Sequence, residues 1–178
     1  MNGRRAAIVM ACAFLASAIL GAAPSFAENH SANGPRAVVA SVASQIRTFP
    51  SWADASFRQK LAPYLTVELI SAIETGLATA QKNDINLYDA ELFTGIQGLS
   101  CVKLIDAKIL RGEVDTASVA ETIAYDGDVP RPAKCSQRMI INFDLKRLGT
   151  AWKIDDVQNA ERKPSIKAIF LDPKKYGS

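Results

Sequence analysis

The chain has 178 residues, 48% of them hydrophobic and 22% charged, with a formal net charge of +3. This length is enough for one globular domain with a hydrophobic core of its own. The nearly balanced charge argues against nucleic acid as a partner, because a protein that binds the phosphate backbone presents a basic stripe.

The first 27 residues have the three parts of a secretory signal peptide. Arg4 and Arg5 form a positive n-region, and the run 6–23 is apolar and uncharged. Residues 25–27 (Ser-Phe-Ala) end in the small-x-small pattern that signal peptidase accepts. We therefore expect Sec export, cleavage after Ala27 and a periplasmic location without a stable membrane anchor.

Three other interpretations of this segment fit less well. An uncleaved anchor is disfavoured because the apolar run is rich in Ala and Gly and is followed at once by the cleavage pattern. Lipidation at Cys12 is disfavoured because only six residues separate it from Arg5, too few for a working h-region. Tat export is disfavoured because no polar Ser precedes the twin arginines.

Removal of residues 1–27 changes the composition that matters for function. The remainder carries 19 basic and 18 acidic side chains and only two cysteines, Cys101 and Cys135. In an oxidising compartment this pair predicts one disulfide, and two separate buried thiols are the alternative. On the chain-entropy model, a bond that closes a loop of about 35 residues stabilises the fold by roughly 3 to 4 kcal/mol.

The first half of the mature chain has helical patterns. Residues 28–34 are small and polar and are expected to form a flexible tail. One apolar stripe then begins after Pro35 and ends before Pro50; it consists of Val38, Val39, Val42, Ile46 and Phe49. We expect a short helix over 52–61 capped by Ser51, and a third helix over 67–82 capped by Thr66 and stopped by residues 82–84.

The second half changes to a period of two. After an irregular stretch at 86–100, four strands are predicted over 102–110, 117–125, 138–146 and 151–157. Residues 111–113 and 148–150 read as hairpin turns, and 125–135 as the connection between hairpins. A short helix or turn at 165–171 closes one domain over 35–171, and 172–178 is expected to be a tail. Helices followed by antiparallel strands predict an α+β fold, with the N-terminal helices packed on one face of a curved sheet of about four strands.

The second predicted hairpin has one apolar face. Setting Leu145 opposite Trp152 puts Phe143 opposite Ile154 and Ile141 opposite Asp156. The apolar face in this register consists of Met139, Ile141, Phe143, Leu145, Trp152 and Ile154. The adjacent pair Asp155 and Asp156 is interpreted as a turn-and-edge signal, because neighbouring strand residues face opposite sides.

Three segments, 61–69, 89–97 and 151–157, resemble the bacterial domain-of-unknown-function family numbered 3828 (DUF3828), which occurs in exported and lipid-anchored envelope proteins. The resemblance spans most of 36–171. That family is similar to the nuclear-transport-factor-2-like and cystatin-like superfamily, whose helices and curved sheet form a cone with a pocket. The family pattern has an acid where this chain has Gly98. The resemblance implies a cone-like fold and no particular activity.

Charged side chains interrupt the apolar rows of the predicted strands. Asp106 and Lys108 interrupt the first strand and Glu121 the second; pairing Leu104 with Ile123 would set Asp106 opposite Glu121. Inward charges on a concave face can bind a polar ligand or act in acid–base chemistry. The candidate ligand-binding residues are therefore Asp106, Lys108, Glu121, Asp156 and Trp152, and the last of these is also expected to be part of the core.

The only histidine, His30, lies in the predicted tail. A histidine-based hydrolase triad, metal site or general base is therefore disfavoured, and no cofactor is expected. The favoured interpretation is a noncatalytic module that binds a small ligand or an envelope protein, with a homodimer through the sheet face as a further expectation. The alternatives are a periplasmic immunity or inhibitor protein and a carboxylate-dependent enzyme that uses Asp106, Glu121 and Asp156. If core residues fill the concave face, the outer sheet face and the 86–100 loop become the places to search.

Overall fold

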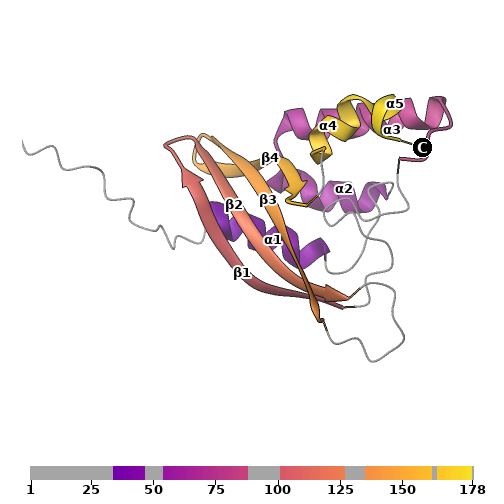
Figure 1. Ribbon diagram of the computed structural model, residues 1–178. Coiled ribbons are helices and arrows are strands. Elements are labelled where there is room, and N and C mark those ends of the chain that lie inside the picture. The colour runs from indigo at the N-terminus through magenta and orange to yellow at the C-terminus, as the bar shows by residue number, and fades with distance from the viewer. Residues whose placement is uncertain (1–33, 47–53, 88–100, 127–134, 162–163, 178) are drawn as a thin grey trace, which may run out of the picture.

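The computed structural model describes residues 34–46, 54–87, 101–126, 135–161 and 164–177 (Figure 1). Helices come first and a curved antiparallel sheet follows, so the predicted α+β class is confirmed. The elements are α1 (Pro35–Ile46), α2 (Ala55–Leu61), the 3-10 turn η1 (Ala62–Tyr64), α3 (Val67–Lys82), β1 (Cys101–Gly112), β2 (Thr116–Asp126), β3 (Gln137–Leu148), β4 (Ala151–Asn159), α4 (Ile166–Leu171) and α5 (Pro173–Tyr176).

The helix boundaries follow from local capping. Thr66 is the N-cap of α3, as predicted, and its hydroxyl accepts a hydrogen bond from the Leu69 N–H at 3.1 Å. In α2 the cap is Asp54, whose carboxylate accepts from the Ser56 N–H at 2.8 Å. The predicted cap Ser51 and the predicted stop at Pro50 lie outside the described residues. Among the described helices, none is both long and apolar enough to span a membrane.

The four strands form a meander in the order β1-β2-β3-β4, each antiparallel to its neighbour. In such a meander the β1–β2 turn and the β3–β4 turn lie at the same end of the sheet. The Arg147 N–H donates to the Asp115 carbonyl at 2.8 Å, which joins the two turns directly. We call this the tip end of the sheet.

The register predicted for the second hairpin is wrong. Leu148 pairs with Ala151 across a two-residue turn, because Gly149 adopts the φ of +63° that such a turn requires. Leu145 therefore pairs with Ile154. A register shift then leaves Asp155 as an extra residue, so that Phe143 pairs with Val157, and Asp156 pairs with Asp144 rather than Ile141.

A similar irregularity alters the first hairpin. Leu104 pairs with Ile123 as expected, but the register shifts at the next residue. Asp106 consequently pairs with Thr122, and Glu121 pairs with Ala107, so the predicted opposition of Asp106 and Glu121 is wrong. One extra residue exchanges the two faces of a strand, which moves Asp106 away from the core.

The inner face of the sheet is filled with apolar side chains that pack against the helices. Five of the six residues predicted for the apolar face are at most 3% exposed: Met139, Ile141, Phe143, Leu145 and Ile154. Trp152 is half-buried at the margin of this cluster. Val39 and Val42 of α1 belong to the same core, which places α1 across the inner face (Figure 1).

The C-terminal segment is more ordered than predicted. Helix α4 matches the expected helix at 165–171, and part of the predicted tail forms α5. Pro173 is buried, and a Cβ at Gly177 would lie 2.1 Å from the Cγ2 of Ile85. The end of the chain therefore packs against the segment that follows α3 (Figure 1).

Candidate functional site

The predicted ligand-binding residues lie in separate environments. Asp106 and Lys108 are exposed on β1, whereas Glu121 is 1% exposed among the core residues of β2. Trp152 packs against the core from β4. The structure does not bring Asp106 and Lys108 together with Glu121, because the bulge in β1 turns them to opposite faces of the sheet.

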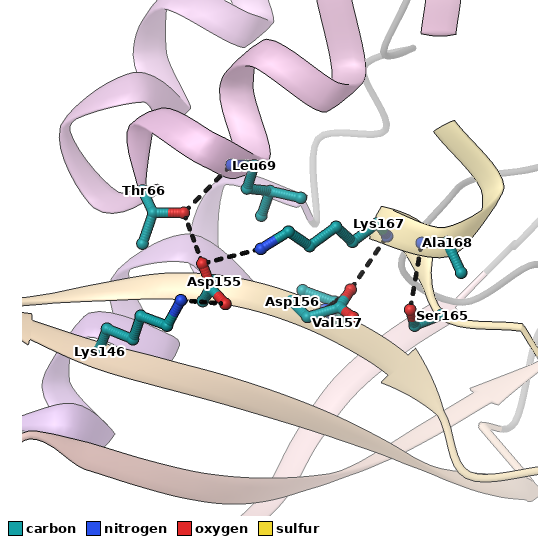
Figure 2. Close-up of polar contacts among 9 residues, drawn as sticks. All are labelled: Thr66, Leu69, Lys146, Asp155, Asp156, Val157, Ser165, Lys167 and Ala168. Atoms are coloured by element: carbon teal, nitrogen blue, oxygen red, sulfur yellow. Dashed lines mark hydrogen bonds and ion pairs between the residues drawn. The ribbon is translucent and has the colours of Figure 1, made fainter. Parts of the chain in front are cut away.

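Asp156 anchors the C-terminal helix. Its Oδ1 accepts from the Val157 N–H at 2.8 Å and from the Lys167 N–H at 3.0 Å (Figure 2). The Ser165 hydroxyl, at the N-cap of α4, accepts from the Ala168 N–H at 3.3 Å. Asp156 therefore satisfies a backbone donor that the first turn of α4 would otherwise leave without a helical partner.

Asp155, the extra residue of the β4 irregularity, is the centre of a polar cluster that we call the Asp155 cluster. Its Oδ1 accepts from the Thr66 hydroxyl at 3.0 Å and from Lys167 Nζ at 3.1 Å, and its Oδ2 lies 3.0 Å from Lys146 Nζ (Figure 2). The Thr66 N–H also donates to the Ile154 carbonyl at 2.9 Å. The Asp155 cluster thus connects the first turn of α3, helix α4 and strands β3 and β4.

The charges of this cluster stabilise one another. Burial raises the pKa of Asp155, but hydrogen bonds from Lys146, Lys167 and Thr66 outweigh it, so the pKa lies below its ordinary value. The hydrogen bond and the charge of Asp155 raise the pKa of Lys146. A carboxylate held ionised between two ammonium groups is suited to joining elements rather than to accepting a proton near neutral pH.

A groove is present on the helical layer of the molecule. It lies between α3 and the α4–α5 segment and has a volume of about 580 Å³. One wall is a row of α3 residues spaced four apart, so that they share a helix face: Val67, Ser71, Thr75 and Thr79. The opposite wall includes Phe170, Leu171 and Pro173.

The groove lies beside an unusually close contact between helices α3 and α4. A Cβ at Gly76 would lie 2.5 Å from the Phe170 carbonyl oxygen and 2.8 Å from its Cα, so only glycine fits there. At this point the backbone of α3 lies against both the backbone and the side chain of Phe170. Thr75 and Thr79, on either side of Gly76 along α3, line the groove.

The groove has both apolar and polar walls. Val67 and Leu171 line it and are 73% and 67% exposed. Glu68, Asp172 and Lys174 also line it, and they place two negative charges and one positive charge beside the hydroxyl row. Its volume is within the range of about 300 to 1,000 Å³ typical of small-molecule sites.

Sequence reasoning missed both the groove and the Asp155 cluster. The four-residue spacing of hydroxyl residues on α3 was a signal for the groove, but its other wall comes from a segment nearly 100 residues later. Within the described ranges, no group of three or more His, Cys, Asp or Glu side chains is placed to hold a metal ion.

Comparison with known proteins adds no identification. No family model matches the chain, and no curated protein matches it.

Proposed function

We propose that the protein is a noncatalytic binding module of the bacterial envelope. In this proposal the groove between α3 and the α4–α5 segment binds a small amphipathic ligand. The groove itself is the observation that supports the proposal, since it combines exposed apolar side chains, a row of hydroxyl groups and charges of both signs.

The remaining candidate chemistry favours binding over catalysis. The alternative enzyme requires Asp106, Glu121 and Asp156 to converge, but the first is exposed, the second is in the core and the third anchors α4. Carboxylates that share a proton or a metal must lie together. No feature of the described residues favours the immunity or inhibitor alternative over a ligand-binding module.

The same proposal includes an envelope location for the protein and a disulfide bond between Cys101 and Cys135. The signal-peptide pattern supports export, and the resemblance to DUF3828 supports an envelope protein with a nuclear-transport-factor-2-like fold. The Cys101 side chain lies outside the described residues, but the backbone geometry supports a Cys101–Cys135 bond. Cys101 pairs with Asp126 in the sheet, and the Asp126 carboxylate accepts from the Cys135 N–H at 2.6 Å.

The groove can be tested with an uncharged amphipathic probe. N-phenyl-1-naphthylamine fluoresces in apolar surroundings and carries an N–H that can donate a hydrogen bond to a Ser or Thr hydroxyl. We expect saturable binding of one dye per chain, and we expect Thr75→Trp, which fills the groove, to weaken it at least about tenfold. Ala78→Trp is the matched control, because Ala78 is exposed on the same helix but does not line the groove.

Two outcomes would overturn the proposed site. One is an absence of saturable dye binding by the folded wild-type protein. The other is equal binding by the Thr75→Trp and Ala78→Trp variants, which would place the dye elsewhere. Circular dichroism of both variants confirms that each is folded before binding is compared.

A further inference from the structure

We propose that the tip end of the sheet is a membrane-contact surface that docks on an anionic phospholipid bilayer. We define this tip surface by five residues: Leu110, Arg111, Val114, Arg147 and Leu148. The inference is independent of the groove, which is formed by α3, α4 and α5 rather than by the strand turns.

The tip surface exposes large apolar side chains on turns that lie next to each other. Val114 is 76% exposed in the β1–β2 turn, and Leu148 is 48% exposed beside the β3–β4 turn. Leu110 is 57% exposed because it lies at a register shift between Ile109 and Arg111, which removes it from regular pairing. Single exposed apolar residues are ordinary, but three at one end of a sheet form a protruding apolar group.

Basic side chains outnumber acidic ones around this apolar group. The segments 108–116 and 146–153 together contain five basic and two acidic residues. Lys146 pairs with Asp155, and Lys153 donates to the Pro63 carbonyl. Two acidic residues, Glu113 and Asp115, flank Val114 in the β1–β2 turn. Of the five basic residues only Lys146 forms an ion pair among the described residues, so the other four and the two acids leave a net charge of +2 for an anionic partner.

Shape and chemistry favour a bilayer over an acidic protein. A stable protein interface needs roughly 800 Å² of complementary surface on each partner, whereas protruding turns present separate apolar side chains. A bilayer can accommodate separate apolar side chains among its headgroups, and its negative surface attracts the flanking arginines. Trp152 pairs with Arg147 across β3 and β4 and is half-buried there, which places an interfacial residue type beside the tip surface.

The test is cosedimentation of the mature protein with vesicles of stated composition. We expect binding to vesicles of phosphatidylglycerol and phosphatidylethanolamine, weakening with added salt, and little binding to phosphatidylcholine vesicles. The triple variant Leu110→Ser, Val114→Ser and Leu148→Ser should bind at least about tenfold more weakly.

A charge-matched pair of variants locates the contact. Arg111→Gln with Arg147→Gln should weaken binding to the anionic vesicles at least about fivefold. Lys103→Gln with Arg138→Gln removes the same charge from exposed positions at the opposite end of the sheet and should leave binding near the wild-type level. Urea denaturation of each variant establishes that a loss of binding is not a loss of folding.

Three results would overturn the proposal. The first is no binding to anionic vesicles by the folded wild-type protein, and the second is equal loss by the two charge variants. The third is binding of polyglutamate as strong as that of phosphatidylglycerol vesicles, which would assign the tip surface to an acidic polypeptide. The dye titration at the groove is a separate measurement, so either proposal can fail alone.

Discussion

At the scale of single residues, Asp155 has the most consequential contacts. Its side chain is 15% exposed and joins a helix cap, a second helix and two strands through Thr66, Lys167 and Lys146. Charge-assisted hydrogen bonds of this kind contribute more to stability than neutral ones. Lys146 is 46% exposed, so solvent screening reduces its share.

We predict that Asp155 makes folding stability depend on pH in the acid range. Its folded pKa lies below the ordinary value of 3.8, so its contribution is complete above that value and disappears as the pH falls through the folded pKa. Asp155→Asn should lower the free energy of unfolding at pH 7 by about 1 to 2 kcal/mol. Urea titrations from pH 7 to pH 3 should show this difference shrinking.

The matched control is Asp106→Asn. Asp106 is exposed and, within the described part of the chain, forms no ion pair. Its replacement should leave stability at pH 7 within about 0.5 kcal/mol of the wild type. An Asp155→Asn variant as stable as the wild type at pH 7 would contradict the assigned role of the cluster.

The sequence predicted the role of a single residue correctly where that role depends on neighbouring positions in the chain. The α3 cap at Thr66 follows from a Thr before an apolar helical pattern, and the structure confirms it. The partner of that Thr is 89 positions away and sits at an irregular point of β4, so no local pattern marks it. The same limit explains why Asp155 and Asp156 read as an edge signal rather than as contacts to two helices.

At the scale of elements, the contact between α3 and α4 depends on one position. The hypothetical Cβ of residue 76 meets backbone atoms of Phe170, which cannot turn away as the end of a side chain can. Phe170 itself is 1% exposed, so it has little room to shift. The groove beside this contact depends on the same spacing between the two helices.

We predict that Gly76→Ala destabilises the protein although Ala is the better helix former. Propensity favours Ala by about 1 kcal/mol, whereas forcing an atom into a packed contact costs typically 1 to 3 kcal/mol. We expect a net loss of up to about 2 kcal/mol in the free energy of unfolding and weaker dye binding in the groove.

Ala78→Gly serves as the control for helix propensity in that experiment. Ala78 is exposed on the same helix, so its replacement should cost about 1 kcal/mol without affecting the groove. A Gly76→Ala variant more stable than the wild type would show that α4 can move aside.

Element boundaries were predictable and register was not. Alternating apolar residues indicated all four strands, because one face of each strand packs on the core. The shifts near Ile105 and Asp155 have no signature in that pattern, since each adds one residue without changing the composition of the strand. The candidate pocket residues were therefore assigned to one face although the structure divides them between two.

At the scale of the whole molecule, the order of patterns determined the fold class. Helical periods followed by four strand periods leave few arrangements other than helices packed on a meander. The places left open for binding were harder to predict. Both the groove and the tip surface arise where segments distant in the sequence meet, and the inner face that the sequence offered as a pocket is filled in the described residues.

A disulfide between Cys101 and Cys135 is the prediction that concerns the whole domain. It would join the start of β1 to the segment that leads into β3, at the opposite end of the sheet from the tip surface. The buried carboxylate of Asp126 already holds that segment, because it accepts from the backbone N–H groups of Cys135 and Ser136 at 2.6 and 2.7 Å. The proposed bond would therefore close a connection whose two ends are positioned by other contacts.

Under the proposed export to an oxidising compartment, we expect the folded protein to resist alkylation at both cysteines until it is reduced, as measured by mass spectrometry. Closure of a loop of about 35 residues predicts that reduction, or Cys101→Ser with Cys135→Ser, lowers the free energy of unfolding by roughly 3 to 4 kcal/mol. If Asp126 positions the ends, Asp126→Asn should slow oxidative closure in the refolding protein, whereas Asp144→Asn, an exposed carboxylate on β3, should not. Rapid alkylation of both thiols in the folded, unreduced protein would contradict the bond.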